Sequence, residues 1–174
     1  QKTSTAFQCL DQSDTTLSAG WYLVYDNLTI NNRVSLTGDV NLILKDGKTL
    51  TSVKGISVPS TASLTIYAQS NSESTAGKLL ITDPEMFFSG IGNDYKLSDR
   101  DSHGNITIVS GVIEAKGGIS GAAIGSALSA SQGGNIVIKG GFVTANGTGG
   151  GAGIGSGANT DGGMVTINGG KVTA

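Results

Sequence analysis

Proline, cysteine and aromatic residues are scarce in this chain, and each shortage excludes a class of protein. The 174 residues include 2 prolines but 28 glycines. Disordered and collagen-like chains are rich in both residues, and collagen also needs glycine at every third position, which this sequence does not have. Aromatic residues make up 5% of the chain, so the apolar content comes from isoleucine, valine, leucine and alanine. High glycine with little proline therefore indicates an ordered, β-rich chain.

Charge and long apolar runs are limited as well. Charged residues make up 14% of the chain and the formal net charge is −2, which leaves no basic footprint for nucleic acid. No apolar run approaches the roughly 18 residues that a membrane-spanning helix needs. Cys9 is the single cysteine, so no disulfide can form within the chain. The length predicts one domain with room for a substantial core.

The two ends of the sequence predict an exported protein. The first residue is Gln1, and no signal segment is present. We therefore expect either a chain whose signal peptide has been removed or part of a longer protein, and both fit a secreted or cell-surface location. The sequence stops at Ala174 in the middle of a repeat, so we expect the natural protein to continue beyond it.

An internal repeat dominates the second half of the chain. Segments 104–115, 134–145 and 163–174 align without gaps and follow the pattern Gly-x-Ile-Thr-Ile-x-Gly-Gly-x-Val-Thr-Ala. The starts of successive segments lie about 30 residues apart, which is within the range of known structural repeats. Repeats of this length are typical of folds in which each repeat stacks on its neighbour.

A second set of equivalent apolar residues, one in each repeat, lies between the repeated segments. Ile91, Ile124 and Ile154 each stand next to small residues. An offset of 11 residues separates each of them from an earlier apolar residue, Leu80, Ile113 and Val143 respectively. Constant internal offsets with variable gaps elsewhere indicate short strands joined by loops of different length.

These patterns predict an all-β fold, a parallel β-solenoid of the right-handed β-helix type. Its turns are expected to take about 22–42 residues, with a regular repeat of about 29–30 residues in the C-terminal half. Turns stacked at about 4.8 Å would align apolar side chains into a continuous core. An antiparallel β-sandwich is the structural alternative, because it also joins many short strands by turns, but it needs no columns that recur at a fixed spacing.

The domain organisation follows from the same repeat. We expect residues 1–19 to form an N-terminal arm and residues 20–174 to form a single solenoid domain. That domain divides into a cap or first turn at 20–36, an insertion at 83–103 and the regular glycine-rich repeats at 104–174. Trp21 and Tyr22 are candidates for covering the first turn, because a solenoid end is an unpaired strand edge.

The insertion carries the candidate metal ligands. Asp99, Asp101 and His103, followed by Gly104, are spaced like the start of a calcium loop, in which a tight turn gathers oxygen ligands on one side. We therefore predict these three residues as metal ligands, with Ca²⁺ as the candidate cation. A solvated polar loop is the alternative, because His103 replaces an oxygen donor and Ser110 stands where a calcium loop has glutamate.

A sugar ligand would be recognised by an aromatic face with carboxylates beside it. The insertion contains this combination of residues. We therefore predict a ligand site formed by Asp94, Tyr95, Asp99 and Asp101. Trp21 and Tyr25 are a second choice.

The sequence offers no catalytic constellation. His103 is the only histidine, so neither a zinc site nor a Ser-His-Asp triad can be argued. A polysaccharide lyase would need a cation site and a basic group, and Arg100 lies in the acidic insertion. A glycoside hydrolase would need two paired carboxylates, and the spacing of the acids pairs none. We therefore expect no enzyme and no catalytic residue, and keep a lyase or hydrolase of the β-helix type as an alternative.

With the intervening Gly-Ala-Gly-Ile-Gly-Ser-Gly at 151–157, the repeat resembles the glycine-rich β-solenoid repeats of secreted and cell-surface proteins of anaerobic bacteria. Segments 38–47 and 63–67 resemble the usual lead-in to those repeats. The resemblance covers residues 20–174 and implies a parallel solenoid. Proteins of this kind are often described as carbohydrate-binding or adhesin-like. The insertion at 83–103 departs from the family pattern, and no catalytic residue set comes with the resemblance.

The expected function is a non-catalytic extracellular module for adhesion or polysaccharide binding. Its partner would be a polysaccharide or a glycan of a host or cell surface, with no nucleic acid and no insertion into a membrane. The alternative is a purely structural stalk or fibre subunit that stacks end to end through the open turn at Ala174.

Overall fold

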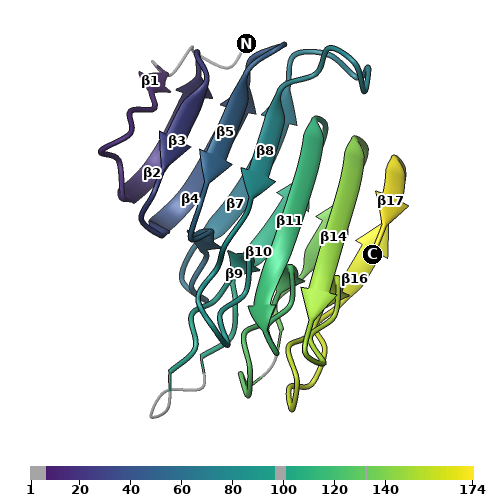
Figure 1. Ribbon diagram of the computed structural model, residues 1–174. Helices are drawn as coiled ribbons and strands as arrows, with labels where there is room; N and C mark the ends of the chain where they lie inside the picture. Colours follow the sequence, from purple (N-terminus) through teal and green to yellow (C-terminus); the bar gives the residue numbers. More distant parts are fainter. Residues whose placement is uncertain (1–6, 97–100, 132) are drawn as a thin grey trace.

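The computed structural model describes residues 7–96, 101–131 and 133–174, which form an all-β fold of short strands joined by loops (Figure 1). Among these residues there is no helix long and apolar enough to cross a membrane. The described strands belong to two sheets, one of 11 strands and one of 6, which we call sheet A and sheet B.

Sheet A combines two long strands in the N-terminal part of the chain with several strands of two residues. Its members are β1 (Gln8–Cys9), β2 (Thr16–Val24), β4 (Val34–Leu44), β6 (Ile56–Ser57), β7 (Ser63–Ala68), β9 (Ile91–Gly92), β10 (Asn105–Ile108), β12 (Ile124–Gly125), β13 (Ile136–Ile138), β15 (Ile154–Gly155) and β16 (Val165–Ile167).

Sheet B lies in front of sheet A in Figure 1, where its strands run side by side from purple to yellow. Its members, in order across the sheet, are β3 (Leu28–Ile30), β5 (Thr49–Ser52), β8 (Lys78–Ile81), β11 (Val112–Ile119), β14 (Phe142–Thr148) and β17 (Lys171–Thr173).

Neighbouring strands in both sheets run parallel. Parallel neighbours need a long crossover connection, and the chain provides it by visiting the other sheet before it returns. Among the described residues, the antiparallel contact is an isolated bridge between Pro59 and His103. The alternative prediction of an antiparallel sandwich is therefore wrong.

The register confirms the columns found in the repeat. Ile106 pairs with Ile136 of the next repeat, and Ile136 pairs in turn with Val165 of the repeat after that. The second column is also in register, since Ile124 pairs with both Ile91 and Ile154. Identical offsets in the sequence therefore correspond to strands that lie next to each other.

One predicted column is displaced by a single residue. Leu79, and not Leu80, pairs with Ile113 in sheet B. Leu79 is fully buried, whereas Leu80 pairs with the exposed Glu114 on the outer face. Because successive side chains of a strand point to opposite faces, a shift of one residue exchanges inside for outside.

The turns at the N-terminal end contain fewer residues than predicted. Tyr22 pairs with Leu42, and the separation of these two residues along the chain is below the smallest expected turn. The largest separation agrees with the prediction, since Leu64 pairs with Ile106 at the upper limit of the expected turn length. Strand β2 begins at Thr16, so the boundary expected between arm and domain falls within a strand.

Trp21 and Tyr22 lie on opposite faces of β2. Tyr22 is buried, and its hydroxyl donates a hydrogen bond to the Ser18 carbonyl at 3.1 Å. The Trp21 ring instead stacks on Tyr67 on the outer face of sheet A, with ring centroids 5.4 Å apart. The edge of β2 at Tyr22 is covered by β1, which pairs with it.

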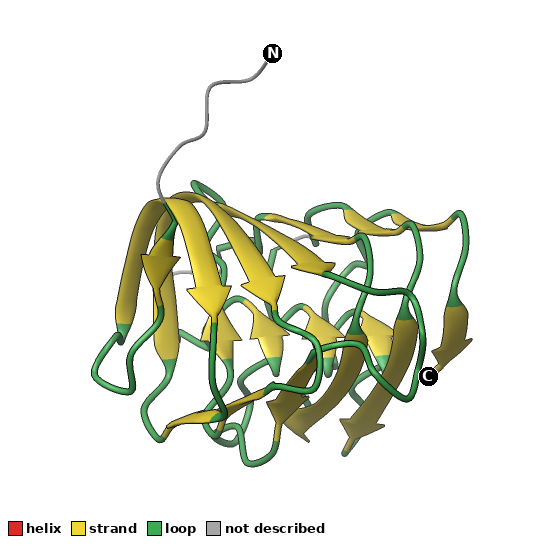
Figure 2. Ribbon diagram, turned by 90° about the horizontal axis from the view of Figure 1, so that it is seen from above, coloured by secondary structure: helices red, strands yellow, loops and turns green. Residues whose placement is uncertain are grey.

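Apolar side chains from both sheets fill the interior between them. In β7 the alternate residues Leu64 and Ile66 are buried, and in β8 Leu79 and Ile81 are buried. Each such side chain contributes about 1.5–3 kcal/mol to stability by leaving water. Figure 2 shows the strands arranged around this interior.

Glycine is required where successive passages of the chain approach each other most closely. Gly125 pairs with Gly92 and Gly155, and its φ is 136°. A Cβ atom at this position would overlap the carbonyl oxygen of Gly155. The glycines of this column therefore permit both the backbone conformation and the close stacking.

We predict that Gly125→Ala is far more costly than Gly47→Ala. Both glycines have positive φ, but a Cβ at Gly47 meets no atom within 4 Å. Gly47→Ala should lower the free energy of unfolding by about 1 kcal/mol, the cost of a left-handed residue. Gly125→Ala adds overpacking and should cost about 3 kcal/mol or more. Urea unfolding followed by circular dichroism measures both, and equal losses would contradict the assigned stacking.

Candidate functional site

The predicted ligand residues Asp94 and Asp101 line the same hollow, which has a volume of about 30 Å³. A buried water needs about 10–15 Å³ of such space, so this hollow has room for one or two waters but not for a sugar ring. Asp99 lies outside the described residues. The predicted sugar site in the insertion is thus brought together in part, without a cavity of the size that a sugar needs.

Asp94 is the counter-ion of Arg33. The guanidinium Nε of Arg33 donates to Asp94 Oδ1 at 2.6 Å, and its Nη1 donates to the carbonyls of Lys54 at 2.8 Å and Ser89 at 2.9 Å. The same group lies over the Phe88 ring, 5.3 Å from its centroid. Burial lowers the pKa of Arg33, and the Asp94 carboxylate opposes that shift. The pair therefore ties the insertion to two earlier passages of the chain.

Tyr95 and Asp101 also make contacts within the protein. The Tyr95 ring packs edge-on against Phe87, with centroids 5.1 Å apart. Asp101 Oδ1 accepts hydrogen bonds from Ser60 Oγ at 2.8 Å and from the backbone N–H of Ser102 at 2.8 Å. These contacts hold the described part of the insertion in place, and a ligand role for either residue stays a prediction.

His103, the predicted metal ligand, is buried. Its Nδ1 lies 2.7 Å from the Gly104 carbonyl oxygen and so carries the proton, while Nε2 is buried without a hydrogen-bond partner. Desolvation lowers the pKa of His103, and the bond to Gly104 acts in the opposite direction. Within the described part of the chain, no three His, Cys, Asp or Glu residues lie close enough to hold a metal ion. The calcium loop, which includes Asp99, stays a prediction.

Three larger hollows follow one another along the outer face of sheet B. Phe142 lines the first, of about 420 Å³, Thr144 and Asn146 line the second, of about 210 Å³, and Thr148 lines the third, of about 380 Å³. These four residues are successive outward positions of β14, so the row of three hollows extends for about 20 Å at 3.3 Å per residue. We call these three hollows the sheet B groove.

The groove results from the two-residue period of the strands. Val143 and Ala145 point into the core, and the residues between them therefore point outward. The parallel register places Thr144 beside Glu114 of β11. It also places Asn146 beside Lys116. Polar side chains of adjacent strands thus line the centre of the groove.

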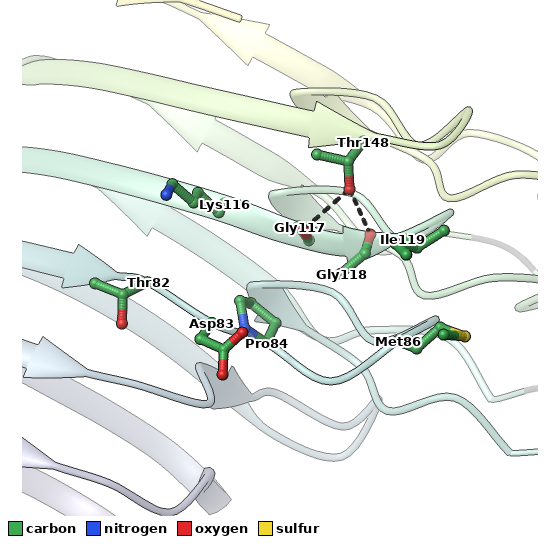
Figure 3. A pocket seen from close by; sticks show the side chains of 9 residues that line it. All are labelled: Thr82, Asp83, Pro84, Met86, Lys116, Gly117, Gly118, Ile119 and Thr148. Carbon is green, nitrogen blue, oxygen red and sulfur yellow. Dashed lines mark hydrogen bonds between the residues drawn. The ribbon is translucent and has the colours of Figure 1, made fainter.

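A bulge in β11 shapes the third hollow. Gly117 and Gly118 stand opposite a single residue of β14, and the Thr148 hydroxyl lies 3.3 and 3.1 Å from their carbonyl oxygens (Figure 3). The segment 82–88 folds alongside, where the backbone N–H of Phe87 donates to the Ile119 carbonyl at 2.9 Å. A bulge of this kind bends a strand and redirects its side chains.

Apolar and charged side chains border this third hollow. Met86 and Ile119 are both more than half exposed at its rim. In Figure 3, Lys116 lies across the hollow from Asp83. The hollow therefore offers an apolar surface beside groups that donate and accept hydrogen bonds.

The carboxylates of the groove are already paired with lysines. Glu114 Oε1 lies 2.7 Å from Lys78 Nζ, and Asp83 Oδ2 lies 2.6 Å from Lys54 Nζ. The hydrogen bond from Lys54 lowers the pKa of Asp83. Lys116 also lowers the pKa of Asp83 through its charge, but it forms no hydrogen bond or ion pair among the described residues. Such a groove can hold a ligand by hydrogen bonds and charge, but it presents no unpaired carboxylates for acid–base catalysis.

Sequence reasoning did not identify this groove. Glu114, Thr144 and Thr173 occupy the same position of the three repeated segments, and the register places them side by side in sheet B. The bulge and the approach of segment 82–88 depend on contacts between distant parts of the chain. The alternation of polar residues along β14 was the available signal.

Comparisons of the chain with protein-family models, with curated proteins and with solved structures give no match.

We predict that Arg33→Met destabilises the protein by about 3 kcal/mol, because it leaves the Asp94 carboxylate without its partner. The side chain of Arg33 is 13% exposed. Lys48→Met removes the exposed pair between Lys48 and Asp26, so it should cost less than about 1 kcal/mol. Urea unfolding of both variants checks the difference, and similar losses would show that Arg33 is no more than a surface charge.

We also predict that acid destabilises the protein through His103. Its folded pKa is lowered, so below the unfolded value of about 6.5 the unfolded chain takes up a proton that the folded chain resists. The melting temperature should be level above about pH 7.5 and fall as the pH drops toward 5. The His103→Gln variant should have a lower melting temperature that no longer depends on pH in this range, since the chain has no other histidine. A slope that persists in the variant would exclude His103 as its source.

Proposed function

We propose that the chain is a non-catalytic module of a secreted or cell-surface protein that binds a polysaccharide along the sheet B groove. The observation that carries this proposal is the linear succession of three hollows along β14. A groove of about 20 Å that is open along its length suits a chain of consecutive sugar residues better than one compact molecule.

We further propose that the fold is a right-handed parallel β-solenoid, as the resemblance implies. Parallel pairing between corresponding strands of successive repeats supports it, together with a path that passes through both sheet A and sheet B in every repeat. In such a fold each passage adds strands to both sheets, so the outer faces become flat and rigid platforms.

The chemistry of the groove fits a sugar ligand. Thr144 provides a hydroxyl group that both donates and accepts, and the amide of Asn146 does the same with two different atoms. Sugar hydroxyls need partners of this double character. The Thr148 hydroxyl donates its proton to the carbonyls of Gly117 and Gly118, so it can only accept from a ligand. Phe142 at one end and Ile119 at the other provide apolar surface for the faces of sugar rings.

An alternative is a structural role in which the module stacks on another unit through β16 and β17. Val165 and Ile167 support this alternative, because they are exposed on the edge strand β16 at 39% and 53%. A lyase or hydrolase is less well supported, since Asp83 and Glu114 are each engaged by a lysine.

We predict that Thr144→Ala/Asn146→Ala weakens polysaccharide binding about tenfold or more, because each lost hydrogen bond is worth about 0.5–1.5 kcal/mol. The matched control is Thr107→Ala/Asn105→Ala, which removes the same two residue types from β10 in sheet A. A panel of immobilised polysaccharides identifies the ligand, and calorimetry measures the affinity. The proposal fails if no polysaccharide binds, or if both double variants weaken binding equally.

A further inference from the structure

We propose that the sheet B groove selects an anionic polysaccharide, one that carries carboxylate or sulfate groups along its chain. This inference rests on the proposed function and names the class of its ligand. It follows from the distribution of free and paired charges in the groove, since the formal net charge of the chain is −2 and predicts no such preference.

Lysines lie near both ends of the groove. Lys116 lines the second and third hollows, while Lys139 and Lys171 line the first. Lys116 and Lys139 are exposed, and in the described part of the chain neither forms a hydrogen bond or an ion pair, although the charge of Lys116 acts on Asp83 at longer range. Lys171 lies 3.6 Å from Glu73, and both side chains are more than half exposed, so this pair is weak.

Each carboxylate that lines the groove forms an ion pair with a lysine outside it, and the charge of Lys116 also lowers the pKa of Asp83. Asp83 is held by Lys54 and Glu114 by Lys78, at 2.6 and 2.7 Å. Neither Lys54 nor Lys78 is among the residues that line the three hollows. The lysines that line the groove or pair with its carboxylates thus outnumber those two carboxylates, so an anionic group that enters the groove meets a local excess of positive charge.

The spacing of these lysines favours a polymer over a small anion. Lys116 pairs in register with Asn146, whereas Lys139 lies just before the start of β14 at Phe142. The backbones of the two lysines are thus about 15–20 Å apart along the strand direction. A single carboxylate or sulfate cannot reach both, but a chain with repeated anionic groups can. Binding at one end then raises the effective concentration of the next anionic group at the other.

The test compares polygalacturonate with its methyl ester, which has the same backbone without the charge, and dextran sulfate with dextran. We expect the protein to bind each anionic polymer at least about tenfold more tightly than its neutral counterpart at low salt, and to lose this preference as salt screens the charges. Lys116→Gln/Lys139→Gln should weaken binding of the anionic polymers about tenfold and weaken binding of the neutral ones far less, because glutamine keeps a hydrogen-bond donor at both positions.

The matched control is Lys45→Gln/Lys48→Gln, which changes the net charge by the same amount. Lys48 precedes β5, three strands from β14 in sheet B, so this pair lies away from the groove. If both double variants weaken binding equally, attraction is a property of the whole surface and the inference is overturned. Equal affinity for charged and neutral polymers also overturns it, and Thr144→Ala/Asn146→Ala then shows whether neutral polysaccharide still binds in the groove. If no polymer binds at all, the proposed function fails together with the inference. Circular dichroism and melting temperatures confirm that each variant is folded.

Discussion

In-register parallel pairing of the backbone is the constraint on which the rest of the structure depends. Each passage of the chain must place its strands opposite those of the preceding passage, so a residue such as Ile136 has Ile106 on one side and Val165 on the other. A buried position therefore favours an apolar residue in every passage, and a close approach requires glycine, as in the column of Gly92, Gly125 and Gly155. Proline is scarce for the same reason, because it would remove a donor from a strand that is paired on both sides.

This constraint explains which features could be predicted from the sequence. Columns in the C-terminal half were recognisable, because three gapless segments carry the same residues at the same offsets. The first half has no such repeat, and the column through Leu79 was consequently placed one residue away, at Leu80. The ion pair of Asp94 could not be predicted in this way, since its partner Arg33 lies 61 residues earlier and no repeat connects the two residues. Long-range ion pairs depend on how the passages stack, and local spacing does not reveal them.

Residues on the outer faces of the sheets are not constrained by packing in the core. Inward residues of β14 must match the apolar columns, whereas Thr144 and Asn146 have only to remain compatible with a strand. The bulge at Gly117 and Gly118 then makes an otherwise flat face uneven, and segment 82–88 packs against the bulged strand. A groove can thus arise on sheet B while the core beneath it is unchanged, which is how a rigid scaffold carries a variable surface.

The groove combines two kinds of side chain with different energetic roles. Threonine and asparagine are short and stand on paired strands, so holding them against a ligand costs little conformational entropy. Lysine loses up to about 2 kcal/mol of rotamer entropy when it is fixed, and its attraction to an anion is reduced by solvent at an exposed site. On this basis the affinity of the proposed site for polysaccharide comes mainly from the short polar side chains and the apolar ends. Lys116 and Lys139 then act chiefly on the choice between charged and neutral chains, because exposed charges contribute more to specificity than to affinity.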